Sequence, residues 1–196
     1  MTRPSDRLTF DAAAHAYTLD GKPCEGVTSV LERMMPGFEA DPFYLQKGTS
    51  VHACMAMIAR GARFTCDPRI SGQVEAGRLF WREMGPDPLA VEARVFSARH
   101  GYAGCLDLAC WIGGKFMLVD YKASIRPSTG HQLAAYGLAA GECGLCPVGQ
   151  IRRGLAVVLK PDGKYSTKEY DLRPLTAEWL ALLGADRVLR KHGVTA

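Results

Sequence analysis

Hydrophobic residues recur at helical spacing in several stretches of the chain. Between residues 43 and 60, Val51, Met55 and Ile58 follow one another at steps of three and four, as on one buried helix face. Thr28 or Ser29 could cap a short helix that ends before Pro36. Helices are predicted at residues 28–34, 43–60, 70–84, 128–140 and 175–191.

Other stretches have the composition and length of β-strands. Strands are predicted at residues 89–96, 102–112, 116–121, 151–159 and 165–170. Gly113-Gly114 would join the second strand to the third by a tight turn, so the first three strands should form an antiparallel meander. Before them, a weak alternation from Leu8 to Leu19 and the turn signal Asp20-Gly21 predict a small N-terminal hairpin.

The order of these elements predicts the fold class. Helices come first, then three strands, a helix, two strands and a last helix. We therefore expect an α/β fold with a mixed four- to five-stranded sheet flanked by helices, preceded by the N-terminal hairpin. A chain of 196 residues suits one domain, spanning residues 1–196.

Composition narrows the functional classes. Hydrophobic residues make up 47% and charged residues 22%, which argues against general disorder. No apolar run approaches the roughly 18 residues that cross a bilayer, and residues 1–6 lack the apolar stretch of a secretion signal. We therefore expect a cytoplasmic protein without a membrane partner. The net charge of +4 is mild but compatible with a phosphate-bearing substrate.

The seven cysteines are odd in number and irregularly spaced, which predicts reduced thiols packed mostly in the core. Cys143-x-x-Cys146 is the one pair with metal-ligand spacing. A zinc site needs four ligands, and no second pair is evident.

Charged residues interrupt the two strands that flank the Gly113-Gly114 turn. Asp107 lies in the first of these strands, and Asp120 and Lys122 lie at the end of the second. Residues two apart on a strand share a face, and a hairpin folded at this turn puts Asp107 opposite Asp120. Two carboxylates in such a position are costly without a cation, and hard oxygen ligands suit Mg²⁺ or Mn²⁺. With a lysine beside them, this is equipment for phosphodiester hydrolysis.

These residues resemble the motif of a known family. Gly-x-x-Asp at residues 104–107, followed by Asp-x-Lys at 120–122, resembles the PD-(D/E)xK nuclease superfamily, which implies a restriction-endonuclease-like core. Gly48-x-x-x-His52 and Gln132-x-x-x-Tyr136 are similar to motifs of its RecB-like exonuclease branch, and Glu92 occupies a strand position that is often acidic there. The likeness spans about residues 17–170, and residues 17–31 are similar to the start of phage and organellar stand-alone exonucleases, which implies a bacterial or phage-encoded protein. Some RecB-like members hold a 4Fe–4S cluster with one upstream cysteine and three near the C-terminus, but no cysteine follows Cys146, so the resemblance implies no iron–sulfur cluster here.

The resemblance implies a role for each residue at the metal. Metal ligands would be the side chains of His52, Asp107 and Asp120 and the backbone carbonyl of Tyr121. The alternatives are a surface salt-bridge cluster for the aspartates and an ordinary helix histidine for His52.

The remaining motif residues would act on water and DNA. Lys122 would position the attacking water and stabilise charge. Glu92 would bind a second metal or orient water, and its alternative is a solvated strand residue. DNA contacts are implied for Gln132, Tyr136 and Ser124, and helix packing is the alternative for the first two. Apart from the resemblance, Arg126 and other basic residues could bind DNA as a phosphate track, with a solvated face as the alternative: Arg126, Arg152, Arg153, Arg187, Arg190 and Lys191.

The resemblance thus implies a Mg²⁺- or Mn²⁺-dependent deoxyribonuclease, an exonuclease acting at DNA ends in recombination or repair. The alternatives are an endonuclease, an inactive DNA-binding protein of the same fold, or an interaction module with zinc at Cys143 and Cys146. A single-strand annealing protein and a homo-oligomer are open as partners.

Overall fold

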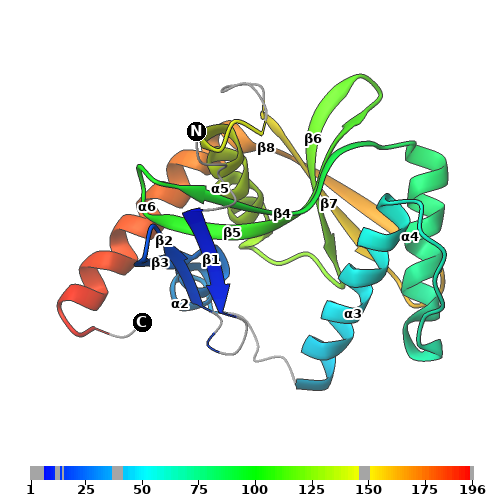
Figure 1. The fold of residues 1–196 in the computed structure, drawn as a ribbon, viewed down its shortest axis with the longest axis horizontal. Helices are drawn as coiled ribbons and strands as arrows, with labels where there is room; N and C mark the ends of the chain where they lie inside the picture. The colour runs from blue at the N-terminus through cyan, green and yellow to red at the C-terminus, as the bar shows by residue number, and fades with distance from the viewer. Residues whose placement is uncertain (1–6, 12–13, 15, 37–41, 146–150, 195–196) are drawn as a thin grey trace.

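A twisted mixed sheet with helices on both faces forms the body of the computed structural model (Figure 1). The structure describes residues 7–11, 14, 16–36, 42–145 and 151–194. Its strands are β1 (Leu8–Asp11), β2 (Ala16–Leu19), β3 (Lys22–Gly26), β4 (Asp87–Ser97), β5 (Tyr102–Ile112), β6 (Lys115–Lys122), β7 (Arg153–Leu159) and β8 (Tyr165–Asp171). Its helices are α2 (Val27–Met34), α3 (Pro42–Ala59), the 3-10 turn η1 (Pro68–Ile70), α4 (Ser71–Met84), α5 (Thr129–Glu142) and α6 (Leu172–Lys191).

The predicted α/β class is confirmed, and the five predicted strands are β4 to β8. The meander β4–β5–β6 is antiparallel, β7 lies parallel to β6, and β8 returns antiparallel to β7. The predicted N-terminal hairpin also exists, but it is part of a larger sheet. The Asp20-Gly21 turn joins β2 to β3, and β3 pairs in parallel with β5, so the sheet has eight strands rather than the predicted four or five.

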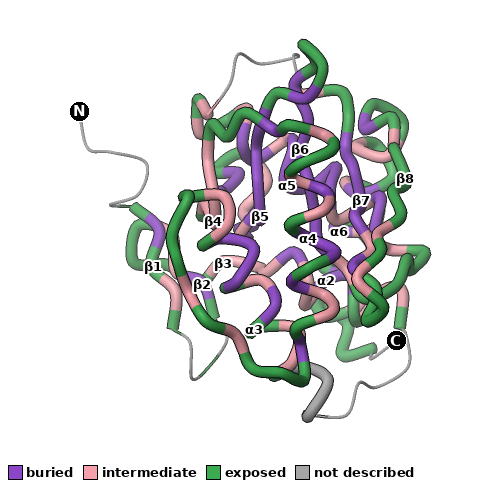
Figure 2. The backbone as a smooth tube through the Cα atoms, turned by 90° about the vertical axis from the view of Figure 1, so that its right-hand side faces the viewer, coloured by how far each residue is buried: buried purple, intermediate pink, exposed green. Residues whose placement is uncertain are grey.

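Two hydrophobic cores lie on opposite faces of this sheet. One core joins the sheet to α2, α5 and α6, and the other joins it to α3 and α4. Figure 2 shows β5, β6 and β7 as the buried centre between these layers. In α4, Val74 and Phe80 are buried, and Leu79 and Trp81 are partly buried. No helix in the described part of the chain is long and apolar enough to cross a membrane.

The start of α2 corrects one prediction. Its N-cap is Gly26, with no side-chain cap, rather than Thr28 or Ser29. The chain passes directly from β3 into the helix at Gly26, where an added Cβ would lie 3.2 Å from the Ser29 hydroxyl. The helix therefore begins too early for either hydroxyl to cap it.

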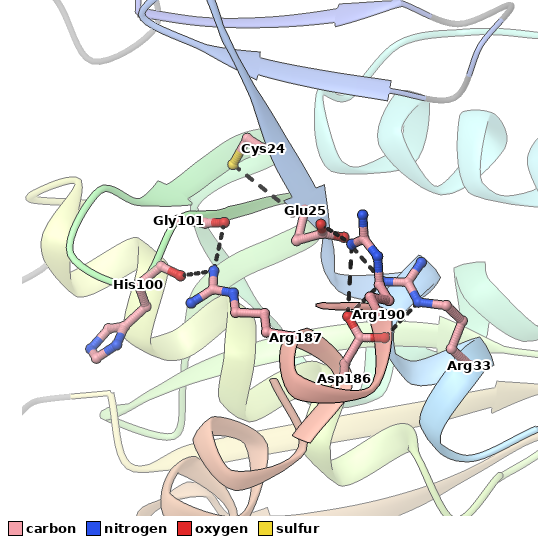
Figure 3. A network of polar contacts seen from close by, with 8 residues as sticks. All are labelled: Cys24, Glu25, Arg33, His100, Gly101, Asp186, Arg187 and Arg190. Atoms are coloured by element: carbon pink, nitrogen blue, oxygen red, sulfur yellow. Dashed lines mark hydrogen bonds and ion pairs between the residues drawn. The ribbon is translucent and has the colours of Figure 1, made fainter. Parts of the chain in front are cut away.

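The basic residues near the C-terminus mainly hold α6 in place (Figure 3). Arg190 pairs with Glu25 of β3, and the Arg187 guanidinium donates to the carbonyls of His100 and Gly101. Asp186, only 2% exposed, accepts from Arg33 of α2 at 2.6 Å. The structure thus favours a packing role over a phosphate track for Arg187 and Arg190.

Candidate metal centre and active site

Strands β5 and β6 separate at the two predicted aspartates. Their ladder runs from the turn to the pair Leu108 and Val119, and the next pair in the same register is Asp107 and Asp120. Beyond this point the start of β5 pairs with β3, while the end of β6 pairs with β7. We call this point the fork. The predicted register is correct, and it places both carboxylates where the sheet divides.

The alternation of inward and outward residues slips by one position at the fork. Leu106 and Ala109 both pack into the core under α5, although residues three apart in a regular strand face opposite sides. The neighbouring strand β4 slips in the same way: Ala90 and Ala93 pack against that core although they are three apart, and Glu92 between them lies opposite Asp107 in the register. Glu92 has a φ of 50°, which is uncommon for a residue other than glycine. Strained backbone of this kind is often found at functional sites.

Three possible metal ligands converge at the fork from α3, β4 and β5. His52 Nδ1 lies 3.1 Å from Asp107 Oδ1, and the Tyr121 N–H donates to Asp107 Oδ2 at 2.8 Å. One ligand atom each from His52, Glu92 and Asp107 lies within 4.8 Å of the other two. The Cys105 thiol also approaches Glu92, with Sγ 3.7 Å from Oε2.

Asp120 belongs to a second cluster on the α5 side of the fork. Lys122 Nζ lies 2.9 Å from Asp120 Oδ2 and donates to Gln132 Oε1 at 2.8 Å. The Gln132 amide in turn donates to the Tyr136 hydroxyl at 3.0 Å. Asp120 Oδ2 is buried and has no hydrogen bond of normal geometry within the described residues, so the lysine compensates its charge without satisfying it as an acceptor.

Packing explains why a glycine precedes Asp107 by three residues. A Cβ on Gly104 would lie 2.4 Å from Cε1 of Tyr136, so only glycine leaves room for the tyrosine ring. Tyr136 is 5% exposed and reaches the fork from the core side. The two sequence motifs Gly-x-x-Asp and Gln-x-x-x-Tyr are thus in direct contact.

Three carboxyl groups lie close together at the fork, and their mutual repulsion and burial favour the binding of a cation. Burial raises the pKa of Asp120 to about 6 even beside Lys122, and the charge of Asp107 adds to this increase. Burial and Asp107 likewise raise the pKa of Glu92. Burial alone would lower the pKa of His52, but Asp107 raises it to about 9. Asp107 itself, although buried, keeps a lowered pKa because His52, Lys122 and the Tyr121 N–H favour its charged form. A divalent cation would relieve this crowding of carboxylates.

The other residues that the sequence indicates belong to neither of the two clusters at the fork. Ser124 and Arg126 are exposed in the loop that follows Lys122, and this loop is held by the Arg126 N–H donating to Thr129 Oγ1 at 3.0 Å. Cys143 Sγ lies 3.3 Å from both the backbone nitrogen and the carbonyl oxygen of Phe96. Cys146 lies outside the described residues.

Two side chains at the fork were missed by the sequence analysis. Trp81 of α4 donates to the Tyr121 hydroxyl at 3.0 Å, and the Tyr121 ring packs against His52. The sequence motif implies a role for Tyr121 only through its carbonyl. Strand alternation could have indicated that its ring leaves the face opposite Asp120 and Lys122.

Neither protein-family models nor curated proteins match this chain. Solved structures do. An exonuclease candidate from Eubacterium rectale matches with a TM-score of 0.53 at 12% identity, over 88% of this chain and 83% of its own. An alkaline exonuclease from Laribacter hongkongensis matches with a TM-score of 0.41 at 11% identity, over 86% of this chain and 92% of its own. The first likeness shows that the chain shares the fold of that solved structure.

Proposed function

We propose that the chain is a divalent-metal-dependent nuclease that hydrolyses phosphodiester bonds of DNA. One observation carries the proposal: buried Asp107 and Asp120 meet at the fork with Lys122 beside them. His52 and Glu92 extend the same cluster. An inactive DNA-binding protein would have no need of two costly buried carboxylates and a lysine in this arrangement.

The residues at the fork fit Mg²⁺ or Mn²⁺. Their donor atoms are carboxylate oxygens and one imidazole nitrogen, and Asp120 Oδ2 is a buried acceptor in need of a partner. His52, Asp107 and Asp120 would hold the ion, with the Tyr121 carbonyl completing the set. Glu92 would bind a second ion or orient a water molecule.

The chain's own residues would carry out the remaining chemistry. A bound divalent ion supplies positive charge for the phosphate and lowers the pKa of water. Lys122 would hold the attacking water and stabilise the charge that develops on the phosphate. Gln132 keeps the lysine Nζ in place through its 2.8 Å hydrogen bond. Ser124 and Arg126, exposed just after the lysine, would contact phosphates along the strand, and Gln132 and Tyr136 would line the site.

We propose exonuclease activity in particular. The motifs resemble the RecB-like exonuclease branch, and the Eubacterium rectale structure of the same fold is named as an exonuclease candidate. The same resemblance supports a cytoplasmic role at DNA ends in recombination or repair, with an annealing protein as a candidate partner and a homo-oligomer as a candidate assembly.

Cleavage of labelled DNA tests the proposal. End-labelled linear DNA and covalently closed circular DNA are incubated with Mg²⁺ or Mn²⁺ and the wild type, Asp120→Ala or Lys122→Ala. We expect the wild type alone to release nucleotides from linear DNA and to spare the circle. Nicking of the circle would indicate an endonuclease. Equal cleavage by all three proteins, or by none, would exclude the proposed function.

A further inference from the structure

Tyr121 connects the two faces of the fork. It stands between Asp120 and Lys122 on β6, but its side chain packs into the opposite core, with α3 and α4. The side chain is almost fully buried, and the backbone N–H donates to Asp107 Oδ2 at 2.8 Å. One residue is therefore in contact with a carboxylate through its backbone while its ring extends toward the other helix layer.

The ring of Tyr121 is held on three sides. The Trp81 indole N–H donates to its hydroxyl at 3.0 Å. The His52 imidazole meets the ring nearly perpendicularly, with centroids 6.5 Å apart and an interplanar angle of 83°. Phe80 meets it in the same way at 6.1 Å and 87°. Edge-to-face contacts are directional, so this arrangement fixes the plane of the imidazole as well as that of the phenol.

From these contacts we infer that Tyr121 and Trp81 are positioning residues for the metal centre. Tyr121 holds Asp107 through its backbone and His52 through its ring, and Trp81 holds the Tyr121 ring. Partners of this kind orient the ligands of a metal and raise its affinity. Helix α4 thus takes part in the metal centre without supplying a ligand. The inference rests on the proposed function, because it concerns the ion that His52 and Asp107 would bind.

The chain offers a matched control on the other face of the sheet. Tyr102 is also a buried tyrosine whose hydroxyl is engaged, in its case donating to the Ala135 carbonyl at 2.9 Å. Its ring also meets a tryptophan edge-on, Trp179, at 5.1 Å and 77°. It packs in the core with α5 and α6, and its hydrogen bond and ring contact are to Ala135 and Trp179, neither of which is a proposed ligand. Loss of its hydroxyl should lower stability without affecting metal affinity.

Calorimetric titration with MnCl₂ alone, in the absence of DNA, tests the inference on the full chain. The proteins compared are the wild type, Trp81→Phe, Tyr121→Phe, the double variant and Tyr102→Phe, each with its melting temperature. We expect roughly tenfold weaker Mn²⁺ binding for each single variant at the fork. The double variant should also bind Mn²⁺ about tenfold more weakly than the wild type, because both substitutions remove the same hydrogen bond, the one between Trp81 and Tyr121. Tyr102→Phe should melt at a lower temperature but bind Mn²⁺ like the wild type.

A second measurement separates positioning from chemistry. Cleavage of linear DNA by Trp81→Phe and Tyr121→Phe should approach the wild-type rate as Mn²⁺ is raised to saturation, whereas Lys122→Ala should not be restored. The inference is wrong if both fork variants bind Mn²⁺ like the wild type, or if Tyr102→Phe weakens binding as much as they do. A wild type that binds no Mn²⁺ would instead overturn the proposed function, and the inference with it.

Discussion

The two ends of the β5–β6 pair differ in their pairing and in the side chains that they bury. Near the turn, Leu108–Ile112 and Lys115–Val119 form an uninterrupted ladder with hydrophobic side chains on both faces. At the fork, one residue beyond this ladder on each strand, the pairing stops, the alternation slips and the buried side chains are carboxylates. The difference teaches that regular pairing stabilises the sheet, whereas its interruption makes room for α3 and α5 to bring polar groups together. Buried carboxylates at such a place lower stability until a cation compensates them.

The largest expected effect comes from Lys122, for which Lys115 on the same strand is the control. Lys122→Ala should lower the rate of DNA cleavage by about 10²- to 10³-fold, because a charge that stabilises the transition state is lost. Lys115→Ala, at the exposed turn end of the same strand, should leave the rate unchanged. Single-turnover cleavage of linear DNA at saturating Mn²⁺ measures both. A similar loss of cleavage rate in the two variants would show that Lys122 has no special role in cleavage at the fork.

Next in size is the effect of a single added methyl group. Gly104→Ala should destabilise the protein by about 1–3 kcal/mol, because the new Cβ overlaps the Tyr136 ring. Gly141→Ala, in α5 where nothing lies within 4 Å of the added Cβ, should stabilise it by up to about 1 kcal/mol. Urea denaturation in EDTA gives both values. A Gly104→Ala variant as stable as the wild type, or more stable, would show that Tyr136 does not pack on Gly104 in solution.

The buried carboxylate at the fork should also make stability depend on pH. The pKa of Asp120 is raised to about 6, so folding favours its protonated form. Its contribution is therefore fully present below the ordinary carboxyl pKa of about 4 and is lost as the pH rises through about 6. The metal-free wild type should lose stability relative to Asp120→Asn between pH 4 and pH 7. Unfolding free energies of both proteins in EDTA across this range provide the measurement, and a constant difference would contradict the raised pKa.

The smallest expected effect concerns the loop after Lys122. Arg126→Ala should raise KM for DNA a few-fold and lower the slope of log KM against log salt by about 0.9, the value for one phosphate contact. Arg173→Ala is the control, because Arg173 is also exposed but is already paired with Asp171. Initial rates at several salt concentrations distinguish them. An unchanged salt slope in Arg126→Ala would mean that this arginine does not contact the DNA backbone.

Much of the fold could be predicted because most elements carry regular patterns. The periodicity of α3 and the Gly113-Gly114 turn were sufficient to place a helix, a hairpin and the register of Asp107 and Asp120. The joining of β3 to β5 could not be predicted, since parallel pairing between residues 25–26 and 102–103 leaves no local trace in the sequence. The predicted start of α2 is wrong because Thr28 and Ser29 have the hydroxyl groups typical of a helix cap. The helix instead begins directly after Gly26, where the packing is close and no side chain caps it.

The site was predictable as a set of residues but not as an arrangement. Motif spacing indicated His52, Glu92, Asp107, Asp120 and Lys122, and the structure gathers them at the fork. Their division into two clusters, one with His52 and one with Lys122, depends on where the alternation slips. A strand pattern read with strict period two cannot show such a slip, nor the contact of Trp81 with Tyr121 across the sheet.

The location of bound Mn²⁺ decides whether the fork is the active centre. Anomalous diffraction from crystals grown with MnCl₂ would reveal the ion directly. We predict a manganese peak coordinated by His52, Asp107 and Asp120, and no such peak in crystals of Asp107→Ala. A strong peak elsewhere in the molecule, or none at the fork in a protein that still degrades DNA, would contradict the proposed centre.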